Sequence, residues 1–311
     1  MGGRVSDPAP PVVPHAGIVA VIGRANVGKS SLINQILGEK LSIVSPVAQT
    51  TRTLIRGIHT EARGQLVLLD TPGMHKAQGD LGRIMNRAAR ASISGCDAAL
   101  LVLDGSAPPR EEDEGWIKKL LRDQLPVVIA LNKTDLGDQH HQTYRDLWDR
   151  LAAQNDTPPP PVLWFPLSAQ TGDGLPALLD QLFQWLPAGP LLFPEDILSD
   201  YPRKLNISDI IREKLFAVVY DELPHELAVW VDSLHEDETS LAIAAEIIVN
   251  KHSQKGIVIG EKGRLLRRVR RNAIRELEAL YEKSVTLDLH VRVEKNWSKN
   301  FWLLKKYGYV A

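Results

Sequence analysis

The stretch that decides the fold is Gly23–Ser30, which reads GRANVGKS and fits the phosphate-binding pattern G-x-x-x-x-G-K-[ST]. The apolar run from Ile18 to Ile22 precedes it and predicts a buried strand. Apolar residues then recur at helical spacing from Leu32 to Leu37. The glycine loop therefore joins a strand to a helix N-terminus, where backbone N–H groups and the helix dipole attract phosphate. We expect Lys29 to reach the β- and γ-phosphates and Ser30 to bind Mg²⁺.

A second motif, Asn132-Lys133-Thr134-Asp135, indicates which base the site reads. It follows the apolar run Val127–Leu131, so it lies at the carboxyl end of a predicted strand, where open α/β sheets bind ligands. Asp135 can accept hydrogen bonds from the N1 and N2 donors of guanine, which adenine lacks in that pattern. Another predicted strand, Val162–Leu167, ends at Ser168-Ala169, whose backbone amide can meet guanine O6. The two motifs, in this order, indicate a guanine-nucleotide-binding protein.

Further predicted site residues lie between these motifs. The predicted strand Leu66–Leu69 ends in Asp70-Thr71-Pro72-Gly73, which places Asp70 to hold Mg²⁺ and the Gly73 amide to sense the γ-phosphate. Thr51 lies in a polar loop before a strand predicted from Leu54 to His59, where it can ligate Mg²⁺ when GTP is bound. The predicted Mg²⁺ ligands are Ser30, Thr51 and Asp70, and the predicted catalytic residues are Asn26, Lys29, Thr51 and Gly73. The residues expected to contact GTP are Gly23, Arg24, Ala25, Asn26, Val27, Gly28, Lys29, Ser30, Ser31, Asp70, Thr71, Pro72, Gly73, Asn132, Lys133, Asp135, Ser168 and Ala169.

The last third of the chain carries a strongly basic segment. Between residues 251 and 275 Lys and Arg dominate and Glu261 is the one acid, and the segment contains the G-x-x-G sequence Gly260-Glu261-Lys262-Gly263. The basic residues of a helix usually form only a solvent-exposed face, and a G-x-x-G sequence alone is weak evidence for nucleic-acid binding. Here it lies in a predicted α-β-β-α-α-β order that is similar to a prokaryotic-type KH domain, whose G-x-x-G loop clamps a nucleic-acid backbone. The residues predicted to bind RNA are Lys255, Gly260, Glu261, Lys262, Gly263, Arg264, Arg267, Arg268 and Arg271.

Chain length, composition and a cluster of prolines indicate two domains. The 311 residues suffice for two cores, the net charge is −1, and the single Cys96 excludes an internal disulfide framework and suits a reducing cytosol. Prolines from Pro187 to Pro202 predict a semi-rigid linker. We expect a disordered tail over 1–16, an α/β P-loop GTPase domain with a mostly parallel sheet flanked by helices over 17–187, a linker over 188–205, and a smaller α+β KH domain with a C-terminal helix over 206–311. No apolar stretch is long enough to span a membrane.

With these motifs in view, the chain resembles the Era family among the translation-factor-related GTPases. The resemblance rests on GRANVGKSSL, on AQTTR at residues 48–52, and on the stretches Pro190–Asp196 and Ile210–Leu215. One departure is Ala25, where the family usually has Pro. The position after DTPG, where Ras-like enzymes place a water-orienting Gln, is Met74, and Asn26 matches the Asn that coordinates a potassium ion beside the phosphates in related GTPases.

The resemblance implies a Mg²⁺-dependent GTPase, using GTP/GDP and potassium, that binds small-subunit ribosomal RNA near its 3′ end and promotes maturation of that subunit. It implies a cytoplasmic monomer that binds no DNA, and it leaves peripheral association with the inner face of the membrane open. Two other functions fit the same residues: an RNA chaperone or assembly scaffold in which nucleotide is only a structural switch, and another ribosome-assembly GTPase with a similar domain order. The C-terminal aromatics Trp297, Trp302, Tyr307 and Tyr309 could stack on bases, although packing of a C-terminal helix is their commoner use.

Overall fold

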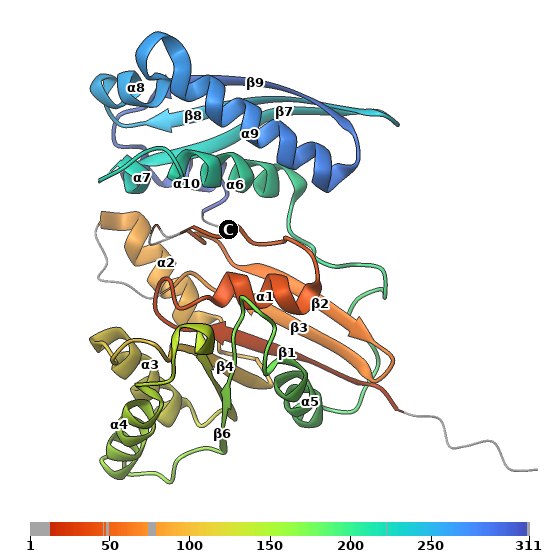
Figure 1. The fold of residues 1–311 in the computed structure, drawn as a ribbon, viewed down its shortest axis with the longest axis vertical. Coiled ribbons are helices and arrows are strands. Elements are labelled where there is room, and N and C mark those ends of the chain that lie inside the picture. Colours follow the sequence, from red (N-terminus) through yellow and green to blue (C-terminus); the bar gives the residue numbers. More distant parts are fainter. Residues whose placement is uncertain (1–12, 46, 48–49, 74–78, 222, 310–311) are drawn as a thin grey trace, which may run out of the picture.

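The protein consists of two α/β units stacked along the long axis of the molecule (Figure 1). The computed structural model describes residues 13–45, 47, 50–73, 79–221 and 223–309. Of the tail predicted over 1–16, residues 1–12 lie outside the described residues, and the first strand begins at His15. Met74 also lies outside them.

The N-terminal unit is built on a six-stranded sheet in the order β2-β3-β1-β4-β5-β6, in which β2 is antiparallel to β3 and all other neighbours are parallel. Strands β3, β4 and β5 are buried along their whole length, as expected for parallel strands covered on both faces. The strands are β1 (His15–Ile22), β2 (Ile55–Glu61), β3 (Gly64–Asp70), β4 (Ala98–Asp104), β5 (Val127–Asn132) and β6 (Val162–Pro166).

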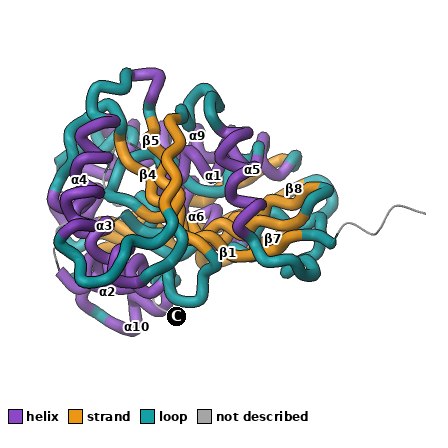
Figure 2. Tube along the Cα trace, turned by 90° about the horizontal axis from the view of Figure 1, so that it is seen from below, coloured by secondary structure: helices purple, strands orange, loops and turns teal. Residues whose placement is uncertain are grey.

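Helices cover both faces of this sheet (Figure 2). Helices α1 (Lys29–Leu37) and α5 (Leu175–Trp185) pack on one face, in one apolar cluster with the strands. On the other face lie α2 (Gly79–Ala91), α3 (Glu111–Asp123) and α4 (His141–Ala153). A 3₁₀ turn, Thr134–Leu136, follows β5. This three-layer order exposes the carboxyl ends of the parallel strands at a single edge, where the predicted motifs lie.

The segment between the two units packs against the N-terminal sheet. The buried side chain of Gln65 accepts hydrogen bonds from the backbone N–H groups of Leu192 and Phe193 and donates to the Phe193 carbonyl, at 2.8–3.0 Å. Phe193 and Ile197 join an apolar cluster with Ile58. This proline-rich segment is therefore held along its path rather than free to swing.

The C-terminal unit is a three-stranded sheet, β7-β8-β9, with the main helices on one face, while Ala228 and Ile248 on the other face pack with Trp297 and Leu304 near the C-terminus. Strands β7 and β8 are antiparallel, whereas β8 and β9 are parallel. Alternate residues along β9 are buried, which places one side of the strand on the core. Its elements are α6 (Arg203–Phe216), α7 (Leu223–Glu226), β7 (Leu227–Glu236), β8 (Ser240–Val249), α8 (His252–Ile259), a 3₁₀ turn (Glu261–Gly263), α9 (Arg264–Tyr281), β9 (Ser284–Val293), a 3₁₀ turn (Trp297–Lys299) and α10 (Phe301–Lys306).

The architecture confirms the predicted fold class, because a mostly parallel sheet flanked by helices is followed by an α-β-β-α-α-β unit. The two units also share apolar contacts. Leu81 and Met85 of α2 pack with Trp297, Leu304 and Tyr307 near the C-terminus. Within the described residues, no helix is both long and apolar enough to cross a membrane.

Candidate functional site: a nucleotide cavity and a glycine loop

The loop Gly23–Ser30 joins β1 to α1 as predicted, and its lysine is enclosed. Lys29 is only 6 % exposed, and its Nζ donates to the carbonyl oxygens of Gly23 and Arg24 at 3.2 and 2.8 Å. Burial lowers the pKa of Lys29 to about 8, although the nearby Asp70 carboxylate opposes that change. A Cβ at Gly73 would lie 2.8 Å from Ala25 Cα and 3.0 Å from Lys29 Nζ, so only glycine lets this backbone approach the loop.

The three predicted Mg²⁺ ligands converge beside that lysine. Ser30 Oγ lies 3.0 Å from Thr51 Oγ1 and donates to Asp70 Oδ2 at 2.9 Å. Asp70 is completely buried, and this burial raises the pKa of its carboxyl against the effect of the Lys29 charge. Asp70 Oδ1 has no hydrogen-bond partner among the described residues. Two hydroxyls and a carboxylate with one open oxygen suit a hard cation such as Mg²⁺, so these residues fit the predicted ion.

Ser42 is a neighbour of this cluster that the sequence motifs did not reveal. It is 1 % exposed, and its hydroxyl lies close enough to the Asp70 carboxylate to lower the pKa of Asp70. Ser42 belongs to the loop that leads from α1 to Thr51, and Asn34 Oδ1 accepts its backbone N–H at 2.9 Å. No motif spacing marks it, because its position depends on how this loop folds back over the strand end.

The base-reading motifs are tied to the phosphate loop through Asn132. Its Nδ2 donates to the Val27 carbonyl at 2.7 Å, and its Oδ1 accepts the Ala169 backbone N–H at 2.8 Å. The Ser168 hydroxyl donates to Asp135 Oδ1 at 2.5 Å, while Asp135 itself is exposed. Asn132 therefore sets the distance between the phosphate end and the base end of the site, and Asp135 faces solvent where a base could pair with it.

Three of the predicted nucleotide contacts have their side chains engaged elsewhere. Arg24 is buried, and its Nε donates to Asp113 Oδ2 at 3.1 Å on α3, with Asp104 Oδ2 3.6 Å from its Nη2. The Thr71 hydroxyl donates to the Val21 carbonyl at 2.8 Å. Lys133 Nζ forms an ion pair with Asp104 at 2.6 Å, so Arg24 and Lys133 meet at one carboxylate beneath the loop. These side chains support the phosphate loop through contacts within the protein. Only the backbone groups of these residues therefore remain for contact with nucleotide.

A cavity of about 390 Å³ lies over this cluster. It is open at one side and walled by the phosphate loop and by the loop that carries Thr51. Its lining includes the predicted residues Ala25, Asn26, Gly28, Lys29, Ser30, Ser31, Thr51, Gly73 and Lys133, together with Ile43, Val44, Ser45 and Thr50. Asp135, Ser168 and Ala169 lie outside this lining, beyond Lys133, where a base attached to the phosphates would reach.

The second predicted site is the loop between α8 and α9. Gly260 and Gly263 have φ angles of 72° and 74°, and Lys262 has the left-handed φ of 50°. A Cβ at Gly260 would lie 2.7 Å from the Leu265 Cβ, so this glycine is required by the start of α9 as well as by its own backbone. Lys262 is exposed and its carbonyl accepts from Arg267 Nη2 at 2.7 Å. Arg267 therefore braces the loop.

The other predicted RNA-binding side chains surround that loop. Lys255 lies on α8, and Arg264, Arg268 and Arg271 are exposed on α9. Glu261 is exposed and lies 3.7 Å from Arg264. The loop and the start of α9 thus present glycine backbone and several exposed cations to solvent, with Glu261 as the one carboxylate among them, an arrangement that fits a phosphodiester backbone.

Comparison with known proteins finds a match for each of the two units. A family model for 50S ribosome-binding GTPases matches residues 18–133, and a KH-domain model matches residues 222–298. GTPase Era of Geobacter sp. (strain M21) is 43 % identical over 297 residues, which cover 95 % of this chain and 98 % of the relative. GTPase Era of Halothermothrix orenii is 37 % identical over 295 residues, covering 94 % and 98 %.

Two solved structures are similar over nearly the whole chain. A crystal structure of Era in complex with MgGDPNP and nucleotides 1506–1542 of 16S ribosomal RNA aligns with a TM-score of 0.87 at 32 % identity, covering 96 % of this chain and 100 % of that one. A variant of Aquifex aeolicus Era bound to GDP and AlF4⁻ aligns with a TM-score of 0.86 at 32 % identity, with the same coverage.

Proposed function

The chain belongs to the Era family of GTPases, and we propose that it couples GTP hydrolysis to the binding of small-subunit ribosomal RNA near its 3′ end. In this proposal residues 17–187 hydrolyse GTP, residues 206–311 bind RNA, and residues 188–205 join them. The protein acts as a cytoplasmic monomer on the assembling small subunit. Support comes from the relative bound to nucleotides 1506–1542 of 16S ribosomal RNA, which aligns over 96 % of this chain.

Hydrolysis in this site depends on positioning and electrostatics. Lys29 supplies a desolvated positive charge at the phosphate end, and Gly73 lies so close that an added Cβ would be 3.0 Å from its Nζ. Mg²⁺, when bound, neutralises charge on the β- and γ-oxygens, and Ser30, Thr51 and Asp70 are the residues that would hold it. Asn26 lines the same cavity with a left-handed φ of 62°, and we assign it to a potassium ion beside the phosphates.

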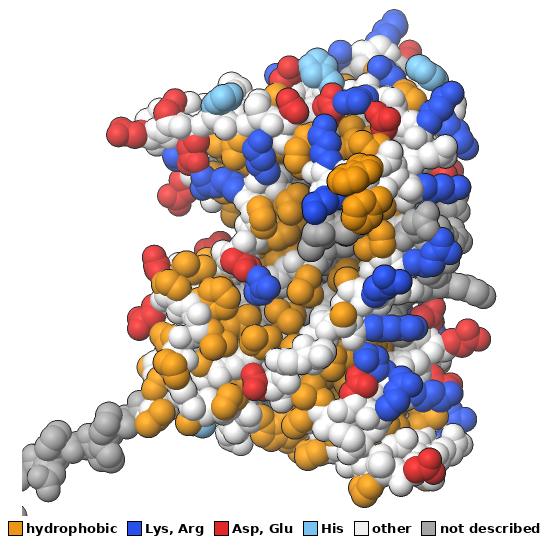
Figure 3. Space-filling model, turned by 180° about the vertical axis from the view of Figure 1, so that it is seen from behind, with side chains coloured by type: hydrophobic (Ala, Val, Ile, Leu, Met, Phe, Trp, Pro, Cys, Tyr) orange, Lys and Arg blue, Asp and Glu red, His pale blue; other side chains and the backbone are white. Residues whose placement is uncertain are grey.

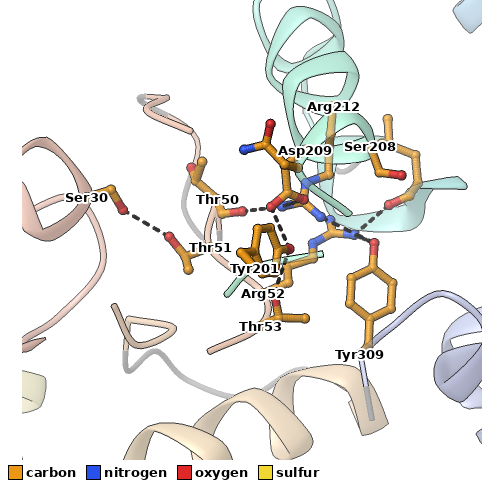
Figure 4. A network of polar contacts seen from close by, with 12 residues as sticks. Ser30, Thr50, Thr51, Arg52, Thr53, Tyr201, Ser208, Asp209, Arg212 and Tyr309 are labelled. Atoms are coloured by element: carbon orange, nitrogen blue, oxygen red, sulfur yellow. Dashed lines mark hydrogen bonds and ion pairs between the residues drawn. The ribbon is translucent and has the colours of Figure 1, made fainter. Parts of the chain in front are cut away.

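The single observation that carries the coupling is the position of three consecutive residues (Figure 4). Thr51 faces the predicted Mg²⁺ site, whereas its neighbours Thr50 and Arg52 hold the C-terminal unit. The Thr50 carbonyl accepts from Arg212 Nη2 at 2.7 Å. Arg52 donates to the carbonyl oxygens of Leu227 and Pro224 at 2.7 and 2.8 Å.

The contacts of these two arginines are buried. Both guanidinium groups approach the Tyr309 hydroxyl, at 3.3 Å from Arg212 and 3.5 Å from Arg52. Arg212 also pairs with Asp209 at 2.8 Å. A hydrogen bond to a charged group contributes about 1.5–3 kcal/mol, so separating residues 50–52 from the C-terminal unit would cost several such bonds. Movement of Thr51 toward or away from the cation must therefore be transmitted to the RNA-binding unit.

Turnover of GTP measured with and without RNA tests this function. We expect an RNA spanning the 3′ end of 16S ribosomal RNA to raise the turnover rate, because residues 50–52 connect the RNA-binding unit to the loop that carries Thr51. An RNA of equal length from another part of 16S is the control. Asp135→Asn is the matched site control, since it should lose GTP turnover and accept xanthosine triphosphate, whose C2 oxygen replaces the guanine amine.

The outcomes separate the alternatives. Nucleotide binding with turnover indifferent to every RNA would support a scaffold in which nucleotide is only a structural switch. Equal stimulation by the control RNA would support a different assembly GTPase. Equal rates in potassium and sodium salts would contradict the assignment of Asn26 alone.

A further inference from the structure

Two neighbouring aromatic side chains near the C-terminus are exposed rather than packed. Trp302 is 76 % exposed and Phe301 is 53 % exposed, and their rings meet edge to face with centroids 5.6 Å apart. By contrast, the nearby Trp297, Tyr307 and Tyr309 are buried. Packing of the C-terminal helix therefore accounts for three of the five aromatics and leaves two large rings in solvent.

These rings stand next to a cleft between the two units. A cavity of about 280 Å³ separates α10 and the preceding turn from helix α2 of the GTPase unit. Aromatic and guanidinium groups share its walls, a combination that stacks well on planar bases. The lining residues are Arg83, Ile84, Arg87, Lys299, Phe301 and Leu304.

The surroundings of this cleft are positively charged although the chain as a whole is not. From Lys295 to Ala311 the sequence contains four lysines and no Asp or Glu. Lys299, Lys305 and Lys306 are exposed on or beside α10, and Arg87 and Arg90 are exposed along α2. Figure 3 shows Lys and Arg side chains following this edge of the molecule, past a cluster of apolar side chains and from one unit to the other.

The cleft lies at the same end of the C-terminal sheet as the Gly260–Gly263 loop. Helix α8, which leads into that loop, contacts α7 through Gln254 and Glu226. The Glu226 carbonyl accepts from Trp297 Nε1 at 2.9 Å, and Trp297 opens the turn before α10. A strand held at the loop can therefore continue along this end of the sheet to the Phe301–Trp302 pair.

We propose that Phe301, Trp302 and the α2–α10 cleft form a second contact surface for single-stranded RNA, which receives the strand leaving the Gly260–Gly263 loop. The inference rests on the proposed function, because it needs RNA at that loop. A KH loop clamps about four nucleotides, so the second surface would lengthen the bound segment. It would also bring RNA against α2, which belongs to the GTPase unit.

RNA fits this surface better than a membrane does. A membrane-binding face places its apolar groups in one outward layer with cations at the rim. Here Phe301 borders a recess that Arg87 and Lys299 also line, so charge and ring face the same small space. A base with its phosphate matches that arrangement, because the ring stacks on the aromatic group while the phosphate meets the cations.

Binding of two RNAs of different length tests the proposal. The shorter oligonucleotide, about five nucleotides, fills only the loop, and the longer one, about fifteen, can reach the cleft. We expect Trp302→Ala to weaken the longer RNA about 5- to 150-fold and to leave the shorter one unchanged. Tyr220→Ala is the matched control, since Tyr220 is 74 % exposed and is not among the residues that line the cleft. Arg87→Gln, on the GTPase unit, should weaken only the longer RNA.

Each outcome has a defined meaning. If Trp302→Ala and Arg87→Gln bind the longer RNA as the unmodified protein does, while the loop variant Glu261→Asp/Lys262→Asp loses both RNAs, the second surface is refuted and the proposed function stands. If the loop variant keeps both RNAs, the proposed function and this inference are both wrong. If Trp302→Ala instead loses binding to vesicles containing anionic lipid and keeps the longer RNA, the surface belongs to a membrane.

Discussion

The loops at Gly23–Ser30 and Gly260–Gly263 use the same local chemistry in opposite surroundings. Each contains glycines and a lysine and leads into a helix, so each offers backbone N–H groups and positive charge to phosphate. Lys29 lies in a cavity where two carbonyl groups accept from it and burial lowers its pKa to about 8. Lys262 stands in solvent at the tip of its loop.

The enclosed loop can therefore recognise one small ligand, whereas the exposed loop is suited to binding a polymer. Around Lys29, buried groups such as Asp70 and Asn132 fix the geometry, so a ligand lacking the matching phosphates and base leaves polar atoms unpaired. Around Lys262, many exposed cations share the charge, so each contact contributes modestly and depends on salt. The same short pattern of residues can serve either purpose, and the surrounding fold decides which.

The largest effect is expected from reversing the charge of the open loop. Glu261→Asp/Lys262→Asp should weaken RNA binding by about 100-fold or more, because the charge-assisted contact of Lys262, about 1.5–3 kcal/mol, is replaced by repulsion between Asp and phosphate. The glycines are kept, since Gly260 is needed for the close approach of Leu265. RNA affinity measured by titration checks the result, and GTP affinity should stay unchanged.

The same dipeptide at the other end of α9 provides the control. Glu282→Asp/Lys283→Asp changes the net charge equally but lies away from the loop, beside Glu236. RNA affinity that falls equally in both variants would mean that only overall charge matters, and the special role given to the open loop would be lost.

An intermediate effect is expected from pH at the enclosed loop. In the nucleotide-free protein the Lys29 ammonium is lost as pH rises through about 8, so GTP affinity should fall by up to about tenfold per pH unit above that value. The unfolded chain keeps the Lys29 proton up to its ordinary pKa of 10.5, whereas the folded protein has already released it. The free energy of unfolding of the nucleotide-free protein should therefore increase as pH rises from about 8 to 10.5.

Calorimetric GTP titrations from pH 7 to 9.5 measure the first effect, and thermal unfolding of the nucleotide-free protein measures the second. Lys29→Met should remove the stability change over that window. GTP affinity that is flat between pH 7.5 and 9.5 would show that the lysine is not desolvated, and the contrast between the two loops would disappear.

The smallest effect is expected from removing one exposed cation near the open loop. Arg268→Gln should weaken all single-stranded RNAs alike and flatten the dependence of log affinity on log salt by about 0.7. Arg267 is a less clean choice, because its guanidinium also donates to the Lys262 carbonyl. A salt slope that is unchanged in Arg268→Gln would remove this residue from the contact.

Much of the fold was predictable because its signals are local. The continuous apolar runs that became β3 and β5 indicate strands buried on both faces, and the polar motifs after them follow at the strand ends. The bounds of helix α6 were harder to predict. The amphipathic pattern alone predicts a helix near Ser208 to Tyr220, but the helix runs from Arg203 to Phe216, and Ser208 donates to the Lys204 carbonyl from inside it. Pro202 marks the start instead.

Contacts between distant segments could not be predicted. Arg52 and Arg212 meet at Tyr309 across more than 90 residues of sequence, and a single chain carries no signal for such pairs. The motif also could not show that Arg24 turns toward Asp113, since this depends on where α3 packs. The two glycine loops can be predicted from their sequence motifs, whereas the contacts that connect them are visible only in the folded structure.

The central claim is that nucleotide at the enclosed loop controls RNA at the open one. The most direct test is the dissociation constant of one RNA, spanning the 3′ end of 16S ribosomal RNA, measured with a nonhydrolysable GTP analogue and with GDP. We predict tighter RNA binding with the GTP analogue and, by linkage, tightening of the analogue by RNA through the same factor. Identical RNA affinities in the two nucleotide states would contradict the coupling through residues 50–52.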